Sequence, residues 1–330
     1  MENKRIMLWD NLKFFLICLV VIGHFVDYYI ESDIYKSIFI FIYSFHMPLF
    51  IFAAGLFHRN KNIPYKVYTY IVLSFILKIF IFFTRNLVDQ DADLKFNEES
   101  GVPWYIFALA IFILITYILR NINKTYILIT WIIIACFCGY DNSIEDTFSL
   151  SRIIIFYPFY LMGTMVDREA LENLAHNRKL KVSAGALIGL WMSACIVLQD
   201  KIYKLRPLFT GRHPFEDIDY NSGCFHRLLC YTISVGIGLC IILVMPTTHI
   251  PFISKAGRCS VQVYFWHRPI LYILASTDAL LLCQNAAGRL LWILCAIVLT
   301  CILSTKYFSF PAMYMLRDIN GQHKSLKEKG

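Results

Sequence analysis

The chain has 330 residues, of which 58% are hydrophobic and only 16% are charged, and its mean hydropathy is +0.57. Soluble domains carry about 25% charged residues, so this composition excludes an ordinary soluble protein and indicates an integral membrane protein with helical spans. The net charge of +8 comes from basic residues that lie mainly in short loops and near the end of the chain, as membrane topology requires, so we do not expect nucleic acid as a partner.

Ten apolar segments are predicted to cross the membrane, and no separate soluble domain of useful size interrupts them. We therefore expect an all-α, polytopic transmembrane helix bundle, one domain over residues 1–330 with a short basic cytoplasmic tail at 306–330. The first apolar run is too long for a signal peptide and lacks a small-residue cleavage site, so we expect it to be retained. The predicted spans are 12–30, 37–57, 67–83, 104–119, 125–140, 152–166, 182–199, 227–245, 260–277 and 288–305.

Basic residues concentrate in alternate connections between these spans, and the positive-inside rule assigns those connections to the cytoplasm, together with both termini. The basic connections are 58–66, 120–124 and 178–181, and the acidic outer ones are 84–102 and 141–150. The outer loop at 200–225 breaks the rule, because it contains Lys201, Lys204, Arg206 and Arg212. This loop is either a substrate-binding segment or a solvated stretch balanced by its own acidic residues.

The first span carries three ionisable residues in one stripe. Eleven positions separate Lys13 from His24, so at about 100° per residue they share a helix face, roughly 16 Å apart along the axis. Asp27 follows His24 by three positions, where it can accept a proton from one ring nitrogen and orient the other as a base. Because such groups are costly at membrane depth, we interpret His24 as catalytic. The alternatives are a packed histidine, a snorkelling Lys13 and an Asp27 at the outer surface.

Further polar residues interrupt the later spans. His46 precedes Pro48, which frees the carbonyl of Ser44 and opens the helix, so His46 is a candidate oxyanion donor or else a packed histidine. Arg268 lies beside His267 inside the ninth span, where it can bind a phosphate of the donor or of a carrier lipid, or pair with an acid such as Asp10.

Residues at the outer ends of spans are candidates for contact with an acceptor. Arg152 and Arg85 are either acceptor ligands or interfacial anchors, and Trp104 is either an interfacial aromatic residue or a platform for sugar stacking. The cysteines lie nearly all in apolar segments, where they behave as small hydrophobic residues. Cys136 and Cys138 lack a second cluster, so we expect no metal site.

Four stretches, taken in order, resemble a known family. They are DNLKFFLICLVVIGH, FHMPLFIFAAG, GVPWYIFALAIF and GRCSVQVYFWHRPI. Their order and spacing resemble the membrane-bound acyltransferase 3 family, most of all its branch of fucose 4-O-acetylase and related acetyltransferases. The resemblance is strongest over residues 5–57. The family's characteristic pair is an arginine followed after ten residues by a histidine. The matching positions here hold Lys13 and His24, and lysine keeps the charge but loses bidentate phosphate recognition.

The resemblance implies transfer of an acyl group, usually acetyl from acetyl-CoA, to a hydroxyl of a cell-surface glycan or its lipid-linked precursor, in a bacterial inner membrane. No permanently bound cofactor is expected, and the partners are the donor, the sugar acceptor and membrane lipids. A cation near the cytoplasmic face and a histidine roughly 16 Å deeper fit the length of a pantetheine arm. Lys13, Arg5 and Arg59 would then bind the phosphates, and the thioester would reach His24.

In the simplest mechanism His24 is a general base that takes the proton of a sugar hydroxyl while that hydroxyl attacks the thioester. A covalent acetyl-histidine is the runner-up. Two other classes of function stay open. The first is a transporter or exporter of a glycan precursor or small anion, for which no internal repeat is evident, and the second is a sensor or assembly protein without catalysis.

Overall fold

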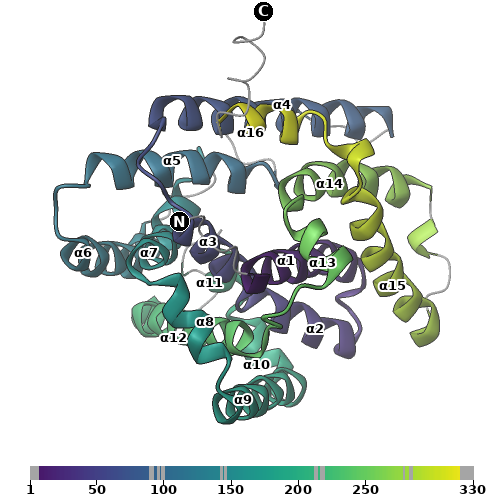
Figure 1. Cartoon of the computed structure of the whole chain (residues 1–330). Coiled ribbons are helices and arrows are strands. Elements are labelled where there is room, and N and C mark those ends of the chain that lie inside the picture. Colours follow the sequence, from purple (N-terminus) through teal and green to yellow (C-terminus); the bar gives the residue numbers. More distant parts are fainter. Residues whose placement is uncertain are drawn as a thin grey trace, which may run out of the picture.

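The structure is a computed structural model that describes residues 7–88, 93–94, 97, 101–141, 144, 147–211, 215, 220–277, 279–281 and 285–319. Its described residues contain helices and connecting turns, with no strand among them, so the predicted all-α bundle is confirmed (Figure 1). The larger helices are α1 (Met7–Val26), α2 (Asp33–Tyr43), α3 (His46–Leu56), α4 (Ile63–Leu87), α5 (Trp104–Ile118), α6 (Lys124–Phe137), α7 (Leu150–Met165), α8 (Arg168–Ala175), α9 (Arg178–Val197), α12 (Gly223–Val244), α14 (Ser260–Ser276), α15 (Ala286–Leu303) and α16 (Ala312–Ile319).

Each predicted span coincides with one of these helices or with a pair of them. Within the part of the chain that the structure describes, five segments are long and apolar enough to cross a membrane: Met7–Tyr29, Asp33–Leu56, Ile63–Leu87, Arg178–Val197 and Tyr220–Val244. Shorter apolar helices lie at Trp104–Ile118, Lys124–Tyr140, Leu150–Met165 and Ala287–Leu303. The connection between α7 and α9 contains α8, whose first turn is capped by the Asp167 carboxylate.

The helix α1 lies inside the bundle, where it packs against α2, α3, α14, α15 and the short helix α13 (Pro251–Gly257). Its first turn is fixed by Asn11, whose amide donates to the carbonyls of Pro246 and Thr248 at 2.9 and 3.0 Å. The Ser254 hydroxyl donates to the same side chain. These bonds hold the predicted cytoplasmic end of α1, so they also set the depth of His24 three turns further on.

Glycine brings α3 and α7 into backbone contact. A Cβ atom added at Gly163 would lie 2.2 Å from the Phe52 carbonyl oxygen, and one at Gly55 would lie 2.0 Å from that of Tyr160. Small residues let membrane helices approach this closely and gain dispersion contacts. This interface joins the helix that carries His46 to the helix that carries Arg152.

The second predicted span is broken in the middle. The helix α2 ends at Tyr43, and α3 begins at His46. The Ser44 carbonyl that Pro48 releases accepts a hydrogen bond from the Ser234 hydroxyl of α12. The expected opening of this helix is therefore present, and a neighbouring helix satisfies the freed acceptor, as the apolar surroundings require.

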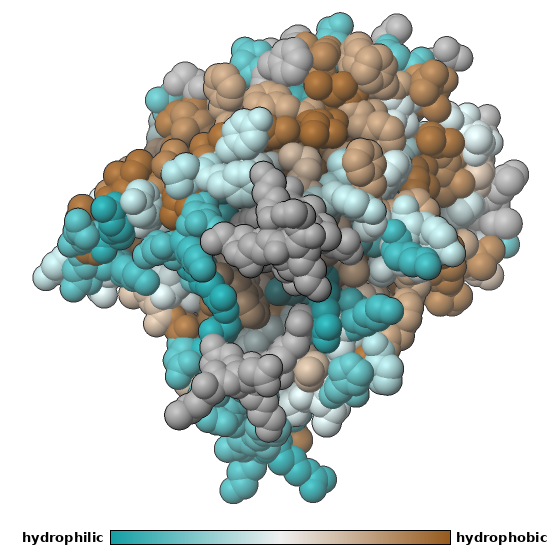
Figure 2. Space-filling view, turned by 45° about the horizontal axis from the view of Figure 1, so that its top comes forward, coloured by the Kyte–Doolittle hydropathy of each residue, from teal (hydrophilic) through white to brown (hydrophobic). Residues whose placement is uncertain are grey.

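Apolar side chains cover much of the outside of the bundle. In Figure 2 hydrophobic residues cover much of the upper part of the view, and hydrophilic residues gather toward its lower part. On α4, Tyr68 and Phe83 expose 64% and 58% of their surface, and on α9, Val197 exposes 77%. Large exposed apolar areas mark lipid or protein contact, and over helices of membrane-spanning length they fit a lipid-facing surface.

Candidate functional site

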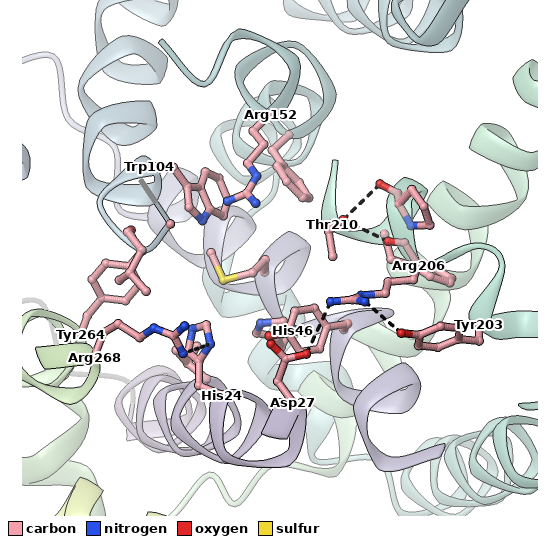
Figure 3. Close-up of a pocket in the computed structure, with 18 of the residues that line it drawn as sticks. His24, Asp27, His46, Trp104, Arg152, Tyr203, Arg206, Thr210, Tyr264 and Arg268 are labelled. Atoms are coloured by element: carbon pink, nitrogen blue, oxygen red, sulfur yellow. Dashed lines mark hydrogen bonds and ion pairs between the residues drawn. The ribbon is translucent and has the colours of Figure 1, made fainter. Parts of the chain in front are cut away.

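A cavity of about 480 Å³ lies among the ends of α1, α5, α7 and α14 and the break between α2 and α3. One wall comes from two short helices, α10 (Gln199–Tyr203) and α11 (Arg206–Thr210), that form from the predicted outer loop. Figure 3 shows the side chains converging on this space. Seven predicted site residues line it: His24, Asp27, His46, Trp104, Arg152, Arg206 and Arg268.

His24 lies between two side chains of α14. The Arg268 guanidinium NH1 is 3.4 Å from His24 Nδ1, and the His24 ring stacks on that of His267 with centroids 5.3 Å apart. A guanidinium can only donate, so Nδ1 is the ring nitrogen that offers a lone pair in this contact. His24 thus has an acceptor nitrogen, next to a fixed cation, in a cavity wide enough for a small substrate.

His267 is fully buried behind His24. Its Nδ1–H donates to the carbonyl of Tyr264 at 2.8 Å, one turn earlier on α14. This bond fixes the plane of the ring, so His267 supports the orientation of His24. The alternative that Arg268 pairs with Asp10 is wrong, because Asp10 pairs with Arg258 at 3.4 Å, before α14 begins.

Asp27 does not orient His24. The α-helix ends at Val26, and Asp27 begins a 3₁₀ turn, Asp27–Tyr29. Its carboxylate pairs with Arg206 NH2 at 3.4 Å instead. The spacing predicted that the two side chains are neighbours, but the ion pair with Arg206 directs the Asp27 carboxylate toward α11 rather than toward the His24 ring. The structure therefore places Asp27 in the cavity but links it to the α11 wall.

His46 is 4% exposed, and its Nδ1–H donates to the Ile42 carbonyl at 2.8 Å. In the neutral ring this bond leaves Nε2 with a lone pair, so His46 can accept a hydrogen bond there but cannot donate one. The predicted role as an oxyanion donor does not fit this arrangement. Arg268 was predicted to bind the acyl donor, and it is the cation that lies against His24.

Arg152 and Trp104 form one unit on the α5–α7 wall. The Arg152 guanidinium lies over the Trp104 ring, with its carbon 4.5 Å from the ring centroid, and Trp104 also stacks on Phe156. Trp104 is 8% exposed, so its ring serves to hold Arg152 rather than to offer an open platform for a sugar.

The other predicted residues lie away from the cavity. The Lys13 amino nitrogen is 4.0 Å from the centroid of Phe57, over which Arg168 also lies, at 5.3 Å. Arg59, two positions after Phe57, is exposed, and Arg5 lies outside the described residues. Lys13 and Arg168 therefore meet at Phe57, toward the predicted cytoplasmic end of α1. Arg85 lies 5.8 Å from the centroid of the Tyr272 ring, which Arg268 contacts from 4.6 Å.

Sequence reasoning missed several residues that complete the site. Lys204, Tyr203 and Tyr43 line the cavity, and Lys204 was detectable as part of the loop that breaks the charge rule. Arg227 of α12 is fully buried and donates from NH1 to the Leu208 carbonyl at 2.7 Å, which anchors α11. Ser151, beside Arg152, donates to the Gly211 carbonyl at the end of α11. No local sequence signal pairs these distant segments.

Comparisons with known proteins assign the chain to a family. The acyltransferase domain family matches residues 8–306. A curated relative, the nodulation protein NolL of Mesorhizobium japonicum, is 30% identical over 186 residues, which are 49% of this chain and 48% of that protein. The match thus spans about half the length of this relative, and no solved structure matches the chain. The family match covers nearly the whole chain, including the helices that surround the cavity, so the protein belongs to the acyltransferase domain family.

Proposed function

We propose that the chain is an O-acetyltransferase that moves acetyl from acetyl-CoA to a hydroxyl of a cell-surface glycan or its lipid-linked precursor, in a bacterial inner membrane. The observation that carries the proposal is the lone pair of His24 Nδ1, held within 3.4 Å of the Arg268 guanidinium in a cavity inside the bundle. The family match supports transfer of an acyl group.

In the proposed reaction, the Arg268 guanidinium turns from His24 Nδ1 to the thioester carbonyl oxygen. The Nδ1 lone pair that this frees takes the proton of the acceptor hydroxyl as the hydroxyl oxygen attacks the thioester carbonyl carbon. The negative charge that develops on the carbonyl oxygen needs fixed donors, and Arg268 is the nearest cation to His24. When the carbon–sulfur bond breaks, the thiolate of CoA leaves and the proton on His24 can pass to it. A covalent acetyl-histidine remains the alternative route to the same products.

The donor would extend along α1. Lys13 and Arg168 around Phe57 are basic groups that suit the CoA phosphates. The eleven positions from Lys13 to His24 correspond to about 16 Å of helix, which the pantetheine arm would bridge.

The test measures binding of acetyl-CoA and release of free thiol by the purified protein in nanodiscs. An acyltransferase binds the donor and releases CoA slowly to water, and faster when an acceptor is present. A transporter of a glycan precursor or anion would neither bind acetyl-CoA at millimolar concentration nor release thiol, and that outcome would contradict the proposal.

A further inference from the structure

Cations outnumber carboxylates among the described residues that line the cavity. Among its described lining residues are four cations, Arg152, Lys204, Arg206 and Arg268, and one carboxylate, Asp27. In Figure 3 the three guanidinium groups point into the space from different sides: Arg268 from α14, Arg152 from α7 and Arg206 from α11. Like charges that face one space repel each other, more strongly where apolar walls lower the dielectric, and an anionic ligand would offset that repulsion.

Each arginine is held in place before any ligand arrives. Arg152 lies over the Trp104 ring, and Arg206 is fixed by the Tyr203 hydroxyl at 2.9 Å and by Asp27 at 3.4 Å. Arg268 lies 4.6 Å from the centroid of Tyr272. Positioned guanidinium groups are well suited to phosphate and carboxylate oxygens, because their N–H groups form a planar fork.

The position of the cations relative to His24 indicates which substrate they serve. Lys13 precedes His24 on α1, whereas Asp27, the partner of Arg206, follows it. The proposed donor phosphates lie at the Lys13 end, about 16 Å from His24, so the Arg206 end is left for the acceptor. The α10–α11 segment that carries Lys204 and Arg206 comes from the predicted outer loop, which is where a cell-surface acceptor would approach.

We infer that the acceptor is an anionic sugar, one that bears a phosphate or a carboxylate near the hydroxyl that is acetylated, and that Arg152, Lys204 and Arg206 bind this anionic group. The inference rests on the proposed function for the identity of the two substrates. It also explains why a predicted outer loop carries basic residues, since these residues bind the acceptor charge.

The test measures equilibrium binding, so it does not depend on turnover. The full-length protein in nanodiscs is titrated with glucose, inorganic phosphate, glucose 1-phosphate and glucuronic acid. We expect at least one of the two anionic sugars to bind about tenfold more tightly than both glucose and inorganic phosphate. Comparison of glucose 1-phosphate with glucuronic acid identifies whether phosphate or carboxylate is preferred. Saturating CoA should leave this binding in place.

Two matched variants locate the binding. Lys204→Gln should weaken binding of the preferred anionic sugar by about fivefold to tenfold. Lys201→Gln, at an exposed position of the same segment outside the cavity lining, should leave it unchanged. Arg206→Gln is expected to weaken binding at least as much as Lys204→Gln, because it removes a positioned guanidinium.

Three results would overturn the inference: equal binding of neutral and anionic sugars, equal effects of the two lysine variants, or displacement of the anionic sugar by CoA. The last result would assign these cations to the donor. A failure of acetyl transfer would contradict the proposed function alone, because the binding titrations do not use it.

Discussion

Arg268 combines two properties at one residue, a fixed charge and a contact with the His24 acceptor nitrogen. If it stabilises the developing oxyanion, Arg268→Gln should lower kcat by roughly 100-fold and leave the KM for acetyl-CoA nearly unchanged. If instead it binds a donor phosphate, as its sequence context suggests, the main effect would be a higher KM for acetyl-CoA. Steady-state kinetics separate the two, with Arg258→Gln as a control, because that arginine pairs with Asp10 outside the cavity.

His58 provides a test of stability against pH. Burial lowers its pKa below the usual 6.5, a bond to Asn60 partly opposes this, and the charges of Lys66 and Lys124 lower it further. The unfolded chain therefore takes up a proton at a higher pH than the folded protein, so the free energy of unfolding falls as pH drops below about 6.5.

The measurement for His58 is the Tm in detergent between about pH 7.5 and pH 5. We expect His58→Gln to show a smaller loss of Tm on acidification than the parent protein. His176→Gln, at an exposed position, is the control. An unchanged pH slope in the His58 variant would contradict the assignment.

At the residue scale, the sequence predicted which side chains line the cavity better than it predicted what those side chains contact. His24, His46 and Arg268 were selected because they are ionisable residues inside apolar segments. Burying an ionisable group in a membrane costs free energy, so such a residue usually has a function. Their partners come from segments far apart in the chain, so spacing alone could not pair Arg268 with His24 or Asp27 with Arg206.

Among the helices, the α3–α7 contact depends on the absence of a side chain. Gly163→Ala would place a methyl group 2.2 Å from the Phe52 carbonyl oxygen, so the helices must separate and packing is lost. We expect destabilisation of about 1–3 kcal/mol, seen as a lower Tm. Gly189→Ala on α9 meets no atom within 4 Å, and its better helix propensity should leave the Tm unchanged or raise it. Equal Tm values for the two variants would show that the close approach is not needed.

At the scale of the helices, hydropathy predicted where the helices lie, and Pro48 predicted the break before His46. The two helices α10 and α11 were not predicted, because each has five residues and lacks a readable period. Tertiary bonds hold both helices. Lys36 donates to Asp200 of α10, and Arg227 and Ser151 donate to the carbonyls of Leu208 in α11 and of Gly211 at its end. Such bonds form only after the bundle has assembled, which is why local sequence could not reveal that wall of the cavity.

Across the whole molecule, α1 connects two basic regions, one around Phe57 and one in the cavity. The positive-inside rule places the first in the cytoplasm and the cavity mouth on the other side. We expect an affinity tag inserted after Asn121 to be reached by antibody only in opened vesicles, and a tag inserted after Leu198 to be reached in intact right-side-out vesicles. Access to both tags from one side would contradict the predicted topology.

The central claim is that His24 performs chemistry in this cavity, and the most direct test is the rate of acetyl transfer by His24→Gln compared with the parent protein and with His176→Gln. All three proteins should fold, as judged by Tm, and bind acetyl-CoA. We predict that His24→Gln loses at least about 100-fold in kcat, because no other group replaces the proton acceptor, whereas His176→Gln keeps the parent rate. Retention of the parent kcat by a folded His24→Gln protein would contradict the account.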